Sequence, residues 1–251
     1  MDPRLDPAPV VATFAARVAP VVDVIGFYAG GSLASGDFRP GVSDLDLVAV
    51  IRHAPDGRRR EELRALHEAT RRGDPAADKL HCAYLPQQDV TDVAASHLSW
   101  THGRFYRRPV TGVARAELLR GGITVLGPAP AELLPDVDDP ALRAAARAEL
   151  TGYWSGAVRR PWLWLDDFCV ELGLLTLARV DATLTDGRLI TKSEALTGLT
   201  RFGVPADLVQ QIARRRQGHD PSLTPWQRVR RARTARRLVA VGIRDLLARK
   251  P

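Results

Sequence analysis

The sequence of 251 residues lacks the features that mark several classes of protein. Its two cysteines, Cys82 and Cys169, lie far apart without metal-ligand spacing, so we expect two small buried side chains. No run reaches the roughly 18 to 20 apolar residues that span a bilayer. Residues 1–18 carry acids and prolines where a secretory signal has a basic and then an apolar stretch. We therefore expect a cytoplasmic protein without a membrane segment.

Charge is distributed unevenly along the chain. Acids exceed bases slightly in residues 1–139, whereas residues 140–251 carry a large excess of bases, and the net charge is +7. An arginine-rich segment near the end could bind nucleic acid, but no stacking platform or reader motif accompanies it. We favour a solvated helix, or an electrostatic funnel for nucleotide, and do not expect a nucleic-acid partner. The segment contains Arg228, Arg230, Arg231, Arg233, Arg236 and Arg237.

Hydrophobic periodicity divides the chain into a mixed part and a helical part. Apolar spacing predicts helices over 8–20 and 58–72, and strands over 21–31, 45–51, 79–85 and 123–127. After the Pro/Asp-rich stretch 128–140, every segment has helical spacing. The fold class is therefore α+β. We expect a domain with a short mixed sheet flanked by helices over 1–135 and an all-helical bundle over 140–251.

The segment from Gly30 to Asp46 carries the chemistry that we expect. A strand ends in Gly30-Gly31-Ser32, a polar loop follows, and Ser43-Asp44-Leu45-Asp46 opens an apolar strand. Strand side chains alternate, so Asp44 and Asp46 point to one face about 6 to 7 Å apart, where they can share Mg²⁺. The glycines let backbone amides approach a phosphate, and Ser32 adds a hydroxyl. Either motif alone is weak, but the combination predicts a triphosphate and metal site.

This pattern resembles the nucleotidyltransferase superfamily, which has the polymerase-beta-like fold. Residues 174–196 and 123–134 are similar to streptomycin/spectinomycin-type aminoglycoside adenylyltransferases, through a Leu-Thr-Leu-x-Arg run, an Asp-Gly turn and a following lysine. The resemblance covers most of residues 24–200. It implies a Mg²⁺-dependent enzyme, expected to be a monomer, that transfers AMP from ATP to a hydroxyl of an aminoglycoside or a related small molecule, as in antibiotic resistance.

The resemblance also implies roles for particular residues. Asp44 and Asp46 hold the metal, while Gly31, Ser32 and Ser43 contact the triphosphate. Lys192 and, less directly, Arg179 reach phosphate from the helical domain, although Lys192 also fits an exposed lysine near a helix start.

One position departs from the family pattern. The strand that matches residues 79–85 carries a glutamate in the family, which acts as general base on the attacking hydroxyl, and this chain has His81 there. Histidine can accept a proton near neutral pH but cannot supply a third carboxylate. His81 is therefore a base, a binding or structural histidine, or the mark of an inactive site, with Asp78 as the fallback carboxylate. The last reading makes the protein a re-purposed nucleotide-binding regulatory or interaction protein.

The residues that recognise the acceptor are less well defined by the sequence. Asp166, Asp167 and Glu171, beside Trp164, form the only dense acidic group of the helical half and suit a polycationic substrate. Acids at the start of a helix also favour its positive end, so this group has an equally good structural explanation. A segment containing His97, Trp100 and His102 could border the substrate cleft, although such clusters more often pack the core.

Overall fold

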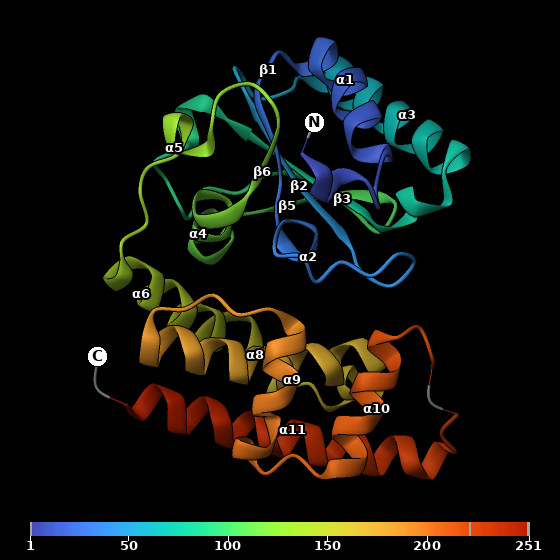
Figure 1. Cartoon of the computed structure of the whole chain (residues 1–251), viewed down its shortest axis with the longest axis vertical. Coiled ribbons are helices and arrows are strands. Elements are labelled where there is room, and N and C mark those ends of the chain that lie inside the picture. Colours follow the sequence, from blue (N-terminus) through green and yellow to red (C-terminus); the bar gives the residue numbers. More distant parts are fainter. Residues whose placement is uncertain (1, 221, 250–251) are drawn as a thin grey trace. The chain divides into compact units, whose positions relative to one another are not determined.

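The structure is a computed structural model that describes residues 2–220 and 222–249 (Figure 1). The chain divides into two compact units, Met1–Val137 and Asp138–Pro251. The first unit contains a six-stranded sheet with flanking helices, and the described residues of the second unit form helices and connecting loops. The predicted α+β class is confirmed.

The first unit is built on a mixed sheet with the strand order β5-β4-β3-β2-β1-β6. Strands β2 and β3 run parallel and are connected through α3, while the other neighbours are antiparallel. The strands are β1 (Val24–Ala29), β2 (Leu45–Ile51), β3 (Leu80–Pro86), β4 (His97–Thr101), β5 (Arg104–Arg108) and β6 (Ile123–Leu126). The helices are α1 (Val10–Val22), α2 (Gly31–Ala34), α3 (Gly57–Gly73), α4 (Gly112–Gly121) and α5 (Pro130–Leu133), with short 3₁₀ turns at Pro3–Leu5, Pro75–Lys79 and Gln87–Asp89.

Helices cover both faces of this sheet, with α1 and α3 on one side and α4 and α5 on the other (Figure 1). In strand β2, alternate side chains pack into the hydrophobic cores on the two faces of the sheet. Leu47 and Ala49 pack into the α1/α3 side, whereas Val48 and Val50 pack into the α4/α5 side. Asp46 therefore belongs to the α4/α5 face, at the end of the strand where that core stops.

The hairpin β4–β5 was not predicted from the sequence. Strand β4 is buried along its whole length, so it lacks the alternation of a half-buried strand, and β5 is a mostly exposed edge strand. Thr101 pairs with Arg104, which leaves a turn of two residues, His102 and Gly103, both with positive φ (51° and 78°). That geometry is typical of the type I′ turns that match the twist of a hairpin.

The second unit has a core of apolar helix faces. Helix α8 is the central element: Leu174, Leu175 and Leu177 are fully buried, and it packs against α6, α9 and α11. No helix within residues 2–220 and 222–249 is long and apolar enough to cross a membrane. The helices are α6 (Asp139–Glu149), α7 (Ser155–Val158), α8 (Asp167–Asp186), α9 (Lys192–Gly198), α10 (Ala206–Arg216) and α11 (Pro225–Ala248), with a π-helical turn at Leu150–Trp154 and 3₁₀ turns at Pro161–Leu165 and Leu199–Phe202.

A buried histidine makes the first unit sensitive to acid. His67 stacks on Trp100 and its Nε2 lies 2.7 Å from the Tyr84 hydroxyl, while burial lowers its pKa from 6.5 to about 3. Below pH 6.5, His67 is protonated in the unfolded chain but stays neutral in the folded chain. The free energy of unfolding therefore decreases as the pH falls from 6.5 toward 3. We expect the free energy of unfolding to fall by about 1.4 kcal/mol per pH unit from this residue.

Urea unfolding of the protein and of His67→Gln at pH 7, 6 and 5 checks this expectation. The variant is destabilised at pH 7 but should show a weaker dependence on pH. Equal pH slopes for the two proteins would show that His67 does not become charged on unfolding.

Candidate functional site

The turn after β1 is built around a glycine that contacts the carboxylate of Asp46. The Gly30 amide donates a hydrogen bond to the Asp46 carbonyl oxygen at 2.8 Å, which ties the turn to β2. Gly31 has a φ of +56°, and a Cβ atom there would meet Asp46 Oδ2 at 2.4 Å. Position 31 thus requires glycine for both its conformation and its space. The Gly-Gly-Ser turn and the Asp-x-Asp segment form one local structure.

Two hydroxyl groups flank this turn. Ser32 lies half-buried in the first turn of α2. Ser43 Oγ accepts a hydrogen bond from the Arg39 amide at 3.0 Å, which closes the loop before β2 and leaves the Ser43 hydroxyl proton free to be donated. Ser43 directly precedes Asp44 in the sequence, and Ser32 follows Gly31, which lies against the Asp46 carboxylate.

The two acids occupy the start of β2. Asp44 immediately precedes the strand, and Asp46 is its only exposed residue, with 52% of the side chain accessible although its strand neighbours are buried. Carboxylate oxygens suit Mg²⁺, which usually keeps only one or two protein carboxylates and takes further ligands from phosphate and water. Among the described residues, no three His, Cys, Asp or Glu side chains are arranged around a common metal position. Asp44 and Asp46 therefore fit a metal whose coordination is completed by a nucleotide.

His81 lies directly across from Asp46 in the sheet. The two residues are register partners in the parallel pair β2–β3, and His81 Nδ1 lies 3.8 Å from Asp46 Oδ1. The residue is 7% exposed, and Nε2 is buried with no hydrogen-bond partner in the described part of the chain. His81 thus stands at the rim of the core with Nδ1 turned toward the acids. The fallback carboxylate, Asp78, accepts a hydrogen bond from Arg71 Nε at 2.8 Å at the surface.

A second histidine lies at this site, although its sequence pattern is more typical of a residue that packs the core. His102, in the turn between β4 and β5, contacts the ring of His81 edge to face, with 4.8 Å between ring centroids. Burial and His81 lower its pKa, and the charge of Asp44 acts against them. The signal that could have revealed it is the His-Gly pair of a two-residue turn. Trp100 and His97, which the sequence grouped with it, are buried in the core.

In the helical unit, the two expected phosphate-binding cations differ in their surroundings. Lys192 is half-buried at the first position of α9, which Thr191 caps by accepting a hydrogen bond from the Glu194 amide. Arg179 Nε donates to the Ile190 carbonyl oxygen at 3.1 Å, so this arginine supports the loop that leads to α9. Both side chains are half-buried, and the charge of Lys192 acts on Glu171 of α8.

The acidic group of the helical unit is largely neutralised by arginines. Asp166 caps α8 by accepting the Phe168 amide, as the helix-start explanation requires. Asp167 pairs with Arg215, Arg228 and Arg231. Burial tends to raise the pKa of Asp167, but the hydrogen bond from Arg231 and the charges of Arg231, Arg228 and Arg215 together lower it.

The third acid of this group, Glu171, is also engaged. Its Oε2 lies 3.5 Å from Arg215 Nε. Burial raises the pKa of Glu171, although the charges of Lys192, Arg215 and Arg216 act to lower it. The acids therefore form an internal ion-pair network with α10 and α11. A polycationic acceptor would have to compete with these arginines for them.

Trp164 lies in the core and does not form part of a binding surface. It is fully buried, and its indole nitrogen donates to the Ala157 carbonyl oxygen at 3.0 Å. The role of Trp164 in substrate binding stays a prediction, and its burial does not favour it. The position follows an exposed tryptophan, Trp162, in a 3₁₀ turn, and the threefold period of that turn places the two rings in different environments.

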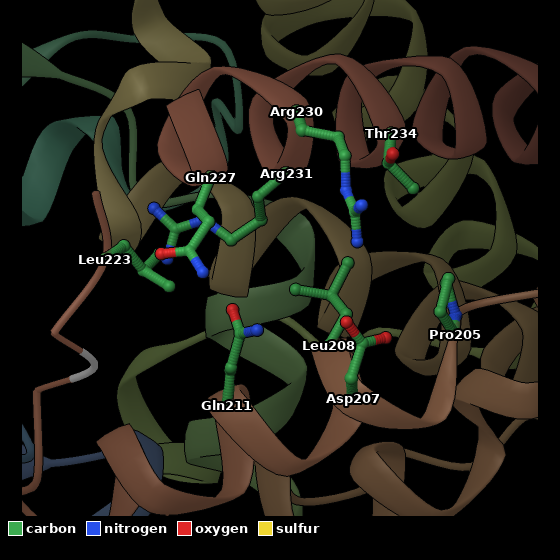
Figure 2. A pocket seen from close by; sticks show the side chains of 9 residues that line it. All are labelled: Pro205, Asp207, Leu208, Gln211, Leu223, Gln227, Arg230, Arg231 and Thr234. Atoms are coloured by element: carbon green, nitrogen blue, oxygen red, sulfur yellow. The ribbon is translucent and has the colours of Figure 1, made fainter. Parts of the chain in front are cut away.

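Several arginines of α11 are structural rather than free to bind nucleic acid. Arg228 and Arg231 pair with Asp167, and Arg236 donates to the Val158 carbonyl oxygen. A pocket of about 170 Å³ lies between α10 and α11, with Arg230 extending from the α11 wall toward Leu208 and Asp207 of α10 (Figure 2). The remaining lining residues are Pro205, Asp207, Leu208, Leu223, Gln227, Arg231 and Thr234. None of the residues predicted to bind nucleotide, metal or substrate lines this pocket.

Comparison with known proteins identifies a similar domain and a similar fold. Residues 13–97 match the family model of the nucleotidyltransferase domain, a range that contains Gly31, Asp44, Asp46 and His81. The structure resembles the crystal structure of spectinomycin adenyltransferase AAD(9) from Enterococcus faecialis with ATP and spectinomycin. The TM-score is 0.69 at 16% sequence identity, and the match covers 95% of this chain and 98% of that chain. No curated protein matches the sequence.

Residues 13–97 are therefore similar to the nucleotidyltransferase domain, and 95% of the chain has a fold similar to that of a spectinomycin adenyltransferase. The family resemblance predicted from the Gly-Gly-Ser turn and the Asp-x-Asp segment is confirmed.

Proposed function

We propose that this protein is a Mg²⁺-dependent nucleotidyltransferase that transfers AMP from ATP to a hydroxyl of a small molecule, an aminoglycoside or a related compound. The observation that carries the proposal is the exposed Asp46 carboxylate, which lies against Gly31 and faces His81 Nδ1. The Asp46 carboxylate is accessible at the end of an otherwise buried strand, and carboxylate oxygens are ligands that a nucleotide-bound Mg²⁺ accepts. The similarity in fold to an adenyltransferase crystallised with ATP supports the same reaction.

Each residue of the site has a defined task in this reaction. Asp44 and Asp46 would hold Mg²⁺, which would supply positive charge to offset the charge that develops on the triphosphate. The Gly31 amide and the hydroxyls of Ser32 and Ser43 bind phosphate oxygens, and Lys192 neutralises a further phosphate charge. His81 accepts the proton of the attacking hydroxyl at Nδ1, the nitrogen that faces Asp46. The hydroxyl oxygen forms a bond to the α-phosphorus. The bond between the α-phosphorus and the oxygen that bridges it to the β-phosphorus breaks, and pyrophosphate leaves with that oxygen.

A second function is favoured by the burial of His81. With the family's glutamate absent and His81 only 7% exposed, the protein would bind nucleotide as a regulatory or interaction protein without transferring it. Pyrophosphate release separates the two functions. We expect release from ATP and Mg²⁺ only when an accepted compound from an aminoglycoside panel is present. ATP binding without release for any acceptor would support the non-catalytic function instead.

Variants of His81 test its role as the base. His81→Ala should lower kcat by about 100-fold with little change in ATP affinity, because a general base acts on the hydroxyl and not on the nucleotide. His81→Glu, which restores the family's residue, should recover part of the loss. His53→Ala removes an exposed histidine elsewhere in the same unit and serves as the control. An unchanged kcat in His81→Ala would exclude His81 as the base.

A further inference from the structure

The pocket between α10 and α11 has walls of opposite charge. Its volume of about 170 Å³ is several times the roughly 30 Å³ that one water molecule occupies in the liquid, so a small molecule fits. Asp207 lines it from α10, and the Arg230 side chain extends toward Asp207 from α11 (Figure 2). Both residues are exposed, and within residues 2–220 and 222–249 neither has an ion pair or a hydrogen bond. Both charges are therefore available to a ligand.

Each wall also holds a buried polar atom that lacks a partner. Gln211 follows Asp207 by one turn of α10, and its Oε1 is buried without a hydrogen bond in the described part of the chain. On α11, Arg231 Nε is buried in the same state, although Nη2 of this side chain donates to Asp167. Buried polar groups nearly always have partners, so exceptions in the wall of a pocket indicate a role in binding. The α10 wall thus needs a donor, and the α11 wall needs an acceptor.

The walls are held in place by contacts within the helical unit. The Arg231 side chain is 6% exposed and is fixed by its ion pair with Asp167 of α8. Gln227 Oε1 accepts a hydrogen bond from the Thr224 amide at 2.9 Å, as part of the cap of α11. Leu208, which lines the pocket from α10, is buried. Binding to such a preformed pocket orders few side chains and therefore costs little entropy.

We propose that this pocket binds a small apolar α-amino acid as its zwitterion. The carboxylate of the ligand binds the Arg230 guanidinium. The ammonium group binds the Asp207 carboxylate and gives Gln211 Oε1 the donor that it lacks, since Asp207 and Gln211 lie on one face of α10 four positions apart. The apolar side chain of the ligand packs against Pro205 and Leu208.

The arrangement of charges disfavours simpler ligands. An anion without an ammonium group would bind Arg230 but be repelled by Asp207, and a cation without a carboxylate would have the reverse conflict. A neutral apolar molecule would leave both charges and Gln211 Oε1 unpaired. The inference is independent of the proposed function, because none of the residues assigned to nucleotide, metal or acceptor lines this pocket.

Titration calorimetry with L-leucine, L-methionine and L-valine tests the class of ligand. We expect saturable binding of at least one of them. Two analogues of leucine are the matched ligand controls: 4-methylpentanoate lacks the ammonium group, and 3-methylbutylamine lacks the carboxylate. Each analogue should bind at least about tenfold more weakly than leucine, because it leaves one charged wall without its partner.

Variants at the two charges locate the binding site. Arg230→Gln and Asp207→Asn should each weaken binding of the amino acid by about tenfold or more. Both side chains are exposed, so the variants should fold, and their melting temperatures without ligand check this. Arg237→Gln removes an exposed arginine of α11 that does not line the pocket, and it should bind as the unsubstituted protein does.

Three results would overturn the inference. Absence of saturable binding by all three amino acids would show that the charges of the two walls do not form a ligand site. Equal binding of 4-methylpentanoate and leucine would show that the pocket does not recognise an ammonium group. Unchanged affinity in Arg230→Gln would place the ligand elsewhere in the protein. Pyrophosphate release is measured separately, so failure of this inference and failure of the proposed function are distinguishable.

Discussion

Replacing Asp46 with Asn is expected to lower nucleotide transfer by about 100-fold or more, because a metal held as we propose would stabilise the transition state by several kcal/mol. The amide keeps the shape of the side chain against Gly31 but lacks the charge that the proposed metal site requires. Asp44→Asn should have a similar effect. Both variants should also lose Mg²⁺-dependent ATP binding, measured by titration calorimetry with and without the metal.

The folded state should tolerate these substitutions. Asp46 is 52% exposed and lies two residues from Asp44, so removing one charge reduces the repulsion between them. We expect the melting temperature to stay the same or to rise. Glu61→Gln, which removes an exposed acid paired with Arg64 on α3, is the matched control and should keep full activity. Normal Mg·ATP binding by Asp46→Asn would show that the metal site is assigned wrongly.

The second large effect is expected on stability and lies in the helical unit. Asp167→Ala should lower the free energy of unfolding by about 3 to 5 kcal/mol, because it leaves the buried charge of Arg231 without its partner. The Arg231 side chain is 6% exposed and its Nη2 donates to Asp167 Oδ1. Four of the five tryptophans belong to this unit, so fluorescence in urea follows its unfolding.

A neighbouring pair in the same network provides the control. Asp220 also pairs with Arg215, but its side chain is 83% exposed, so Asp220→Ala should cost less than about 1 kcal/mol. The pKa of Asp167 is lowered in the folded state, so its contribution to stability is present above its unfolded pKa and is lost as the pH falls through the folded one. Equal effects of the two substitutions would show that burial of the network has no energetic consequence.

Local patterns in the sequence were sufficient for much of the fold. The strand predicted over 45–51 has those bounds in the structure, and the strands predicted over 79–85 and 123–127 shift by a residue at most at either end. These elements have strong apolar patterns between turn residues, which act within a few positions of the chain. The hairpin β4–β5 was missed because one strand is buried on both faces and the other is a charged edge, so neither shows alternation.

The sequence by itself determined the class of the protein and located the segment that we propose binds phosphate and metal. Gly31, Asp44 and Asp46 lie within one short stretch of the chain, and the alternation of strand side chains is enough to relate the two acids to each other. The roles of residues that come from separate strands and helices depended on the tertiary structure. Strand pairing brought His102 onto His81, and helix packing placed Trp164 in the core and Asp167 among arginines. Such contacts join residues far apart in the sequence, and only the folded chain decides which of them meet.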